Sequence, residues 1–363
     1  MAAGTKRNQT KDGAGSYTAE HIEVLEGLEA VRKRPGMYIG GTGSGGLTHL
    51  LWEIIDNGVD EAAAGHAKIV EVIFHPDGSY EVTDDGRGMP IEVKDGSITA
   101  LEIVFTELHA GGKFGNGAYG ASGGLHGVGA SVVNALSSRM VVEVDRKSAT
   151  HCLAFKEQVA GQVGNSGRFV PGHSLRKTGK VPSGRTGTRV RFWPDKDIFD
   201  PDAEINYEEV RERLGQICFL VPGLKIRLAD KRKGSKRPSE EFVSKGGLAD
   251  YVDFLSGENT SVTGLVRVQG VGEFLEKVPV DGKLTEVTRE CQVDIALKWV
   301  QNYESQIVSF VNTIPTPDGG THVAGFERSL TTSLNQALAA ADPRKLRKLK
   351  EEAKVQKEDA QEG

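Results

Sequence analysis

The stretch HLLWEIIDNGVDEA (residues 49–62) carries two superimposed helical patterns. Its apolar residues recur three and four positions apart, which predicts an amphipathic helix over residues 45–64. A four-residue spacing also aligns His49, Glu53 and Asn57 on one side of that helix, one turn above another. An ordinary exposed helix face would carry Lys, Gln or Glu of mixed sign, so this stripe is either functional or an unusual surface.

A hairpin with an abrupt end is expected next. Residues 68–75 and 80–83 have the alternation typical of strands, and HPDGS between them is a turn. The second strand runs directly into DDGRGMP (84–90), where strand propensity is lost. The glycines of this segment allow the backbone to approach a ligand or another segment closely.

Glycine is concentrated in one further place. The chain has 46 glycines in 363 residues, and nine of them fall within GGKFGNGAYGASGGLHGVG (111–129). Such a stretch is either a flexible linker or a lid that cradles phosphates at a helix N-terminus. The larger side chains between the glycines, such as Lys113 and Tyr119, favour the lid. A helix is expected over residues 130–136.

Composition limits the class of protein. A length of 363 residues predicts about two domains, and no apolar run is long enough to cross a bilayer. The N-terminus lacks a secretory leader, and the three cysteines are far apart with no zinc-site spacing, so we expect a cytoplasmic protein. A net charge of −5 disfavours a simple nucleic-acid-binding module, the alternative of a different class.

The polar residues can supply the groups that triphosphate chemistry needs, although no GxxxxGK[ST] sequence occurs. Asn57 offers a hard oxygen ligand to Mg²⁺, Glu53 can act as a general base, and His49 can hydrogen-bond that carboxylate. Backbone N–H groups of the lid and Lys113 can contact phosphates. Asp84, at a strand end, can accept a hydrogen bond from the exocyclic amino group of adenine.

These motifs resemble those of the GHKL ATPase superfamily, which includes gyrase, Hsp90, MutL and histidine kinases. The four blocks that carry the resemblance are E-x-x-D-N-x-x-D-E-A (53–62), DDGRGMP (84–90), HAGGKF (109–114) and GGLHGVG (123–129). Three more blocks look like the B subunits of bacterial type II DNA topoisomerases, either DNA gyrase or topoisomerase IV: VRKRPGMYIG (31–40), TGTRVRFWP (186–194) and GGTHVAGF (319–326).

The resemblance covers roughly residues 17–340 and implies an α+β fold of two domains. It implies a GHKL (Bergerat) α/β sandwich ATPase domain followed by a transducer domain similar to ribosomal S5 domain 2. The expected boundaries are a flexible tail (1–16), the ATPase domain (17–243), a truncated transducer domain (244–340) and a charged tail (341–363).

The resemblance also implies the cofactors ATP and Mg²⁺ and a role for individual residues. Glu53 would be the catalytic base, His49 its support, and Asn57 the metal ligand. The residues expected to bind ATP are Asn57, Asp84, Gly88, Met89, Lys113, Tyr119, Leu125, His126, Gly127, Val128, Gly129, Thr188 and Tyr17. The residues expected to bind aminocoumarin-type inhibitors are Asp84, Arg87, Arg146, Thr188, Ile54, Val82 and Val190.

The partners implied are a second copy of the chain, DNA and a topoisomerase A subunit. An N-terminal arm with Tyr17 and Ile22 would swap across a homodimer when ATP binds, and gate closure would capture a DNA segment. The full enzyme would be a heterotetramer with the A subunit. The sequence does not decide between a structural and a functional role for Asp56, Asp60 and Asp85.

The sequence departs from the family pattern after His322. The family places a second catalytic lysine in a Q-T-K loop of the second domain, and no such loop follows here. We therefore expect a truncated N-terminal fragment that binds ATP but hydrolyses it weakly. The residues of the motifs resemble those of topoisomerase IV slightly more than those of gyrase. MutL-like and Hsp90-like ATPases are further alternatives.

Overall fold

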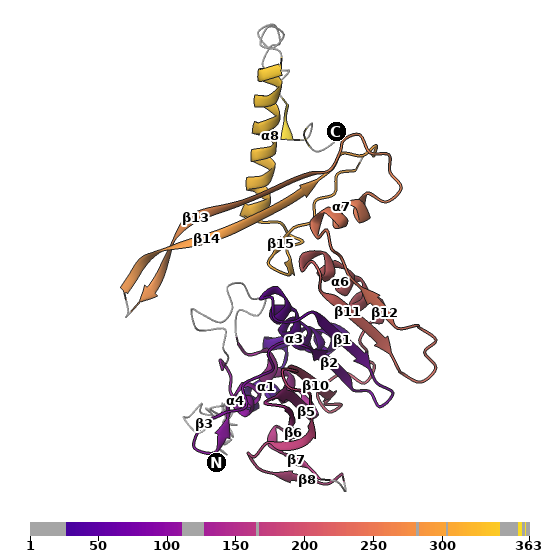
Figure 1. The fold of residues 1–363 in the computed structure, drawn as a ribbon, viewed down its shortest axis with the longest axis vertical. Helices are drawn as coiled ribbons and strands as arrows, with labels where there is room; N and C mark the ends of the chain where they lie inside the picture. The colour runs from indigo at the N-terminus through magenta and orange to yellow at the C-terminus, as the bar shows by residue number, and fades with distance from the viewer. Residues whose placement is uncertain are drawn as a thin grey trace, which may run out of the picture.

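The computed structural model describes residues 27–110, 127–164, 167–280, 283–302, 304–341, 355–357 and 360. Its first part is a mixed sheet packed against helices, and its second part is a long hairpin beside a long helix (Figure 1). This arrangement agrees with the α+β class expected from the sequence.

One ten-stranded sheet organises the first part. Its strand order is β12-β11-β1-β2-β10-β5-β6-β7-β8, with β9 beside β6. Of the pairs described, only β1 with β11 is parallel. The strands are β1 (Ile69–Phe74), β2 (Tyr80–Asp84), β5 (Ser137–Arg146), β6 (Ala149–Lys156), β7 (Val159–Val163), β8 (Phe169–Pro171), β9 (Arg176–Lys180), β10 (Gly187–Pro194), β11 (Lys225–Asp230) and β12 (Glu240–Phe242).

The sheet places alternate residues of neighbouring strands on a common face. Val82 of β2 lies opposite Val72 of β1 and Val190 of β10, and all three are buried. Intervening residues such as Arg189 and Glu143 pair with each other on the opposite, polar face. One face of the sheet therefore packs against the core and the other faces solvent, as is usual when polar and apolar residues alternate in an antiparallel sheet.

The helices supply the other layer of the core. They are α1 (Gly27–Lys33), α2 (Gly36–Ile39), α3 (Ser44–Ala63), α4 (Ala100–Thr106), α5 (Gly129–Ala135) and α6 (Tyr207–Leu220). α3 packs on β1 and β2, α5 packs on β5, and α1 and α4 pack on α5. The apolar stripe of α3, with Leu50, Leu51 and Ile55 fully buried, anchors this layer.

Sequence expectations and structure agree for α3 and differ at three places. Apolar periodicity predicts a helix over residues 98–110, but the structure has the shorter α4, because β3 (Val93–Asp95) and β4 (Ile98–Thr99) precede it and Thr99 accepts a hydrogen bond at its N-terminus. The residues near 158–184 are polar and show no clear hydrophobic pattern, yet they contain β7, β8 and β9. These short strands lack apolar alternation, so only their pairing reveals them.

The third difference concerns VRKRPGMYIG (31–40), whose Pro-Gly pair and three neighbouring cations predict a solvated surface turn as the alternative to a functional role. Most of this segment is helical in α1 and α2, and Val31 is fully buried. Arg32 donates to the carbonyl of Ala135 and pairs with Asp195, each at 2.8 Å. Arg32 therefore ties the first helix to α5 and to the end of β10.

The second part begins at α7 (Leu248–Ser256). It continues through the long hairpin β13 (Val266–Val280) and β14 (Lys283–Leu297), the small hairpin β15 (Phe310–Val311) and β16 (Ile314–Pro315), and α8 (Thr321–Ala341). The sequence does not predict β13, because its residues do not alternate cleanly. Figure 1 shows the long hairpin projecting away from the sheet. Among the described residues, no helix is long and apolar enough to cross a membrane.

Two neighbouring glycines of α3 offer a test of this packing. A Cβ at Gly46 would lie 2.0 Å from the carbonyl oxygen of Gly41, whereas one at Gly45 meets nothing within 4 Å. We expect Gly46→Ala to destabilise the protein by about 1–3 kcal/mol, because the backbone must move. Gly45→Ala should be neutral or stabilise by up to about 1 kcal/mol through helix propensity. Urea unfolding measures both, and equal stabilities would contradict the packing of α3 against Gly41.

Candidate functional site

The polar stripe of α3 forms one wall of the candidate site. His49 Nε2 lies 3.1 Å from Glu53 Oε1, and Asn57 Nδ2 donates to the Glu53 backbone carbonyl at 2.8 Å. The hydrogen bond to Glu53 raises the pKa of His49. Both side chains are partly exposed, 46% for His49 and 31% for Glu53, so a ligand can reach this carboxylate.

The end of the glycine-rich segment meets the same carboxylate. A Cβ added to Gly129, the first residue of α5, would lie only 1.8 Å from Glu53 Oε2. No side chain fits between them, so the backbone at Gly129 is held directly against Glu53. Gly127 has a positive φ of 61°, a conformation that glycine adopts without strain. The structure therefore places Gly129, one of the residues expected to bind ATP, beside the carboxylate expected to be the base.

The end of β2 comes close to α3 beside Asn57. Asp84 shares the packed face of the sheet with its register partners Val70 and Thr188. A Cβ at Gly58 would lie 3.1 Å from Val70 and 3.4 Å from Asp84 Cβ. Gly58, next to Asn57 in the chain, therefore lets α3 approach the sheet where Asp84 lies. The helix stripe and the strand end converge in space.

Asp84 is a half-buried acid in an acidic setting. Burial raises its pKa to about 7, and the nearby Glu61 carboxylate pushes it in the same direction. The Gly86 N–H donates to Asp84 Oδ1 at 2.8 Å, which opposes the rise. A carboxyl with this pKa takes up or releases a proton near neutrality, and its ionised form accepts hydrogen bonds from N–H donors.

The turn after Asp84 is fixed by contacts that the motif alone does not reveal. Arg87 pairs with Glu61 at 2.7 Å, and its backbone N–H donates to the same carboxylate at 3.0 Å. Met89 N–H donates to Thr188 Oγ1 at 3.3 Å, which links the turn to β10. Gly88 has a positive φ of 73° and lies against the carbonyl oxygens of Asp145 and Gly187. Glu61, which sequence reasoning leaves unassigned, is the organising residue of this turn.

Two of the three undecided acids have structural partners. Asp85 accepts hydrogen bonds from the backbone N–H groups of Lys68 and Ile69, at 2.6 and 2.8 Å. Asp56 lies 3.7 Å from the Arg213 guanidinium, which stacks over the Trp52 ring. Asp85 thus connects β1 to the turn, and Asp56 helps to hold α6 on α3.

The remaining expected residues fall into two groups. Ile54, Val82 and Val190 are buried beneath the site, and Arg146 ends β5 with its guanidinium 3.9 Å from Glu92. The other group lies outside the described residues and comprises Tyr17, Ile22, Lys113, Tyr119, Leu125 and His126.

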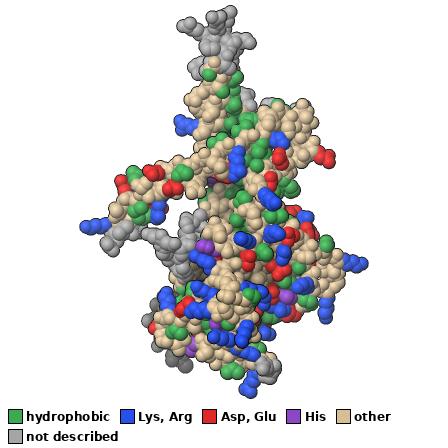
Figure 2. Space-filling model, in the orientation of Figure 1, with side chains coloured by type: hydrophobic (Ala, Val, Ile, Leu, Met, Phe, Trp, Pro, Cys, Tyr) green, Lys and Arg blue, Asp and Glu red, His purple; other side chains and the backbone are tan. Residues whose placement is uncertain are grey.

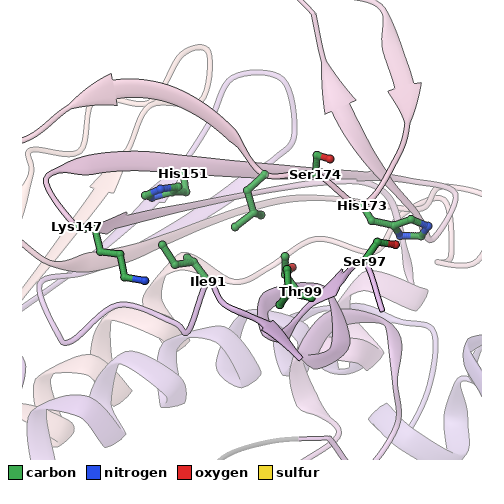
Figure 3. Close-up of a pocket in the computed structure, with 9 residues that line it drawn as sticks. Ile91, Ser97, Thr99, Lys147, His151, His173 and Ser174 are labelled. Carbon is green, nitrogen blue, oxygen red and sulfur yellow. The ribbon is translucent and has the colours of Figure 1, made fainter. Parts of the chain in front are cut away.

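A second cleft of about 410 Å³ lies beyond this site (Figure 3). It begins at Ile91, two residues after Met89, and continues past Lys147 and His151 to His173. His173 Nδ1 lies 2.7 Å from the buried carboxylate of Glu102. None of the described residues that the sequence predicted for the site lines this cleft.

Comparisons with known proteins give the family. The model for histidine kinase-, DNA gyrase B- and HSP90-like ATPases matches residues 43–198, and the DNA gyrase B model matches residues 247–363. The chain is similar to the DNA gyrase B protein of Streptococcus pyogenes serotype M1, with 42% identity over 88% of this chain and 45% of the relative. It is also similar to the DNA gyrase B protein of Enterococcus faecalis, with 41% identity over 97% of this chain and 50% of the relative.

A solved relative has the same architecture. It is the 43K ATPase domain of Thermus thermophilus gyrase B in complex with an aminocoumarin, with a TM-score of 0.67 and 36% identity. The match covers 86% of this chain and 74% of that one. The chain belongs to the DNA gyrase B family. It spans about half the length of the curated gyrase B relatives.

This assignment bears out the expected GHKL fold with a gyrase B transducer domain. The expectation that topoisomerase IV is the nearer relative is not supported: gyrase is favoured, because the relatives named above are all gyrase B proteins.

The residues present fit a single Mg²⁺ ion that takes most of its ligands from bound phosphates and water, and not from the protein. Asn57 uses its amide nitrogen to bond the helix backbone, which turns its harder oxygen atom toward other groups. No group of three or more His, Cys, Asp or Glu residues suited to a metal occurs in the described part of the chain. Mg²⁺ commonly keeps waters and phosphate oxygens as most of its ligands, so one amide oxygen at this place is sufficient.

The half-buried Asp84 predicts a particular dependence of stability on pH. Between pH 4 and 7 the unfolded chain ionises Asp84 while the folded protein keeps it protonated, so folding takes up a proton and stability falls as pH rises. Wild type should lose stability relative to Asp84→Asn by up to about 1.4 kcal/mol per pH unit in this window. Urea titrations of both proteins at several pH values test this, and parallel profiles would contradict the raised pKa.

Proposed function

We propose that this chain is the ATP-binding and ATP-hydrolysing N-terminal region of a type II DNA topoisomerase B subunit. The observation that carries the proposal is the convergence of three groups from distant parts of the chain. Glu53 on α3 lies against the backbone at Gly129, and Gly58, five residues further along α3, lies against the strand end at Asp84. Membership of the gyrase B family supports ATP as the nucleotide.

Glu53 is proposed as the general base. Its carboxylate is partly exposed and can accept a proton from a water that attacks the γ-phosphate. His49 hydrogen-bonds Glu53 Oε1 and leaves Oε2 directed at Gly129. His49 is therefore a positioning residue, which fixes the carboxylate and whose own positive form is favoured by it. Asn57 would hold Mg²⁺, which supplies charge neutralisation for the phosphates when bound.

Asp84 is proposed as the base-recognition residue. Its carboxyl is half-buried, and a hydrogen bond to an amino group is stronger in such partly desolvated surroundings than in solution. Thr188 lies opposite Asp84 in the register and also receives the Met89 N–H. Gly88 and Met89 would therefore be held beside the bound adenine by the same contacts that fix the turn.

The pocket is also proposed to accept aminocoumarin-type inhibitors. The Thermus thermophilus gyrase B domain named above was solved in complex with an aminocoumarin. In this chain, Ile54, Val82 and Val190 supply an apolar floor, and Asp84 with Thr188 supplies polar contacts. Arg87, held by Glu61, and Arg146, near Glu92, are the cations proposed at the mouth.

The activity of the whole enzyme extends the proposal beyond this chain. ATP binding would close a homodimer through the N-terminal arm with Tyr17 and Ile22, capture a DNA segment and allow strand passage together with an A subunit. Lys113, Tyr119, Leu125 and His126 would complete the phosphate lid. The relatives favour gyrase over topoisomerase IV as the parent enzyme, and a cytoplasmic location follows from either.

The domain boundaries are proposed on the same basis. A flexible tail (1–16) would precede the ATPase domain (17–243), and the transducer domain (244–340) would precede a charged tail. The junction near residue 243 is supported by the change from the sheet edge at β12 to α7. Phe219 of α6 stacks on Tyr251 of α7 with ring centroids 4.9 Å apart, so an apolar contact joins the two parts.

Two substitutions separate hydrolysis from binding. Glu53→Ala should keep ATP binding and lower hydrolysis by about 10²–10⁴-fold, because the base is lost. Asp84→Asn should weaken stabilisation by adenine nucleotides, because a neutral amide oxygen is a weaker hydrogen-bond acceptor than an ionised carboxylate. Phosphate release measures hydrolysis, and the rise in melting temperature with Mg²⁺ and a non-hydrolysable ATP analogue measures binding.

Glu212→Ala is the matched control, since Glu212 is an exposed helix carboxylate on α6. It should match wild type in both assays. The proposal fails if wild type shows no nucleotide-dependent stabilisation, or if Glu53→Ala hydrolyses ATP at the wild-type rate.

A further inference from the structure

One segment of the chain has an extreme charge bias that the net charge of −5 conceals. Residues 158–194 contain seven Lys or Arg and no Asp or Glu. The whole chain has 50 acidic residues in 363, so a stretch of this length would be expected to hold about five. The seven cations are Arg168, Arg176, Lys177, Lys180, Arg185, Arg189 and Arg191.

This segment forms the outer edge of the sheet. β9 pairs with the first half of β6, where Lys180 lies opposite Ala149 and Lys177 opposite His151. β7 pairs with the second half of β6, and β8 pairs with β7. Figure 1 shows β6, β7 and β8 at the end of the molecule away from α7 and the long hairpin. β8 and β9 are therefore outermost, and neither has a second partner among the described strands.

Some of these cations are neutralised within the fold. Arg185 pairs with Asp145 at 3.0 Å, Arg189 with Glu143 at 2.6 Å and Arg191 with Asp77 at 2.9 Å. Arg176 donates to the carbonyl of Val163 and so ties β9 to β7. These four residues therefore have structural roles in the sheet.

The other three cations, Arg168, Lys177 and Lys180, form what we call the β8–β9 edge. All three are exposed, and within the described ranges none has a carboxylate within 4.0 Å. Figure 2 shows Lys and Arg side chains on the lower part of the molecule, where Figure 1 places β6 to β8. Because their charge is not cancelled locally, these residues attract a polyanion.

The backbone around these cations is open to a close contact. Gly167 and Gly184 have positive φ values of 75° and 84°, and a Cβ at either would meet nothing within 4 Å. The outer side of β9 also presents backbone N–H groups that no described strand accepts. Backbone N–H groups and Lys or Arg side chains are the usual donors to nucleic-acid phosphates.

We propose that the β8–β9 edge binds duplex DNA through its phosphates, at a place separate from the nucleotide site and from the second part of the chain. The choice of DNA as the polyanion rests on the proposed topoisomerase function. Lysines on an edge strand can also serve only to prevent pairing with another sheet. A purely protective edge would show no salt-dependent binding of DNA, which separates the two roles.

The test measures binding of a fluorescent 30-base-pair duplex at several salt concentrations. The triple variant R168Q/K177Q/K180Q should reduce the slope of log affinity against log salt by about 2.7, which is 0.9 for each of three phosphate contacts. At 0.1 M salt its affinity should fall by about two orders of magnitude. The charge-conserving variant R168K/K177R/K180R should bind like wild type.

The matched control is K231Q/K233Q/K236Q, which removes three lysines from the loop between β11 and β12 at the opposite edge of the sheet. It should leave the slope within about 0.5 of wild type. Absence of wild-type binding, or an equal loss in both glutamine triples, would overturn the proposal. Nucleotide-dependent thermal stabilisation of each variant reports folding and the ATP site independently, so failure of the DNA surface is distinguishable from failure of the proposed ATPase.

Discussion

The close approach of α3 to the end of β2 is the constraint on which the rest of the structure depends. Gly58 lets the helix lie against Val70 and Asp84, and Gly129 lets the backbone before α5 lie against Glu53. A side chain at either position would separate elements that must meet. The two glycines therefore hold the proposed general base against the backbone before α5 and bring α3, beside the proposed metal ligand, to the strand end at Asp84, although more than seventy residues separate Glu53 from Gly129.

The pattern of α3 could be predicted because both of its stripes follow one helical period. Its expected span of 45–64 agrees with Ser44–Ala63, and the three polar residues lie on one wall as expected. The roles of Glu61 and Asp85 could not be assigned in the same way. Glu61 holds Arg87 and its backbone N–H, and Asp85 receives two N–H groups of β1, so each role depends on a neighbour distant in sequence.

The edge strands illustrate a different limit of sequence reasoning. β8 and β9 are the outermost strands at this end of the sheet, and β7 lies between β6 and β8. All three are short and show little apolar alternation. Gly161, for example, is required because a Cβ there would lie 2.4 Å from the carbonyl oxygen of Val170 on β8. Pairing between strands, and not the local pattern, decides such elements. The same rim carries the cations that a whole-chain net charge averages away.

A crystal structure with Mg²⁺ and a non-hydrolysable ATP analogue would test most directly whether Asp84, Asn57 and Glu53 contact one nucleotide. We expect the adenine amino group within hydrogen-bond distance of Asp84, the metal on the Asn57 oxygen, and the γ-phosphate beside Glu53 and the backbone at Gly129. An analogue bound in the cleft between Ile91 and His173, or an adenine that leaves Asp84 uncontacted, would contradict the account.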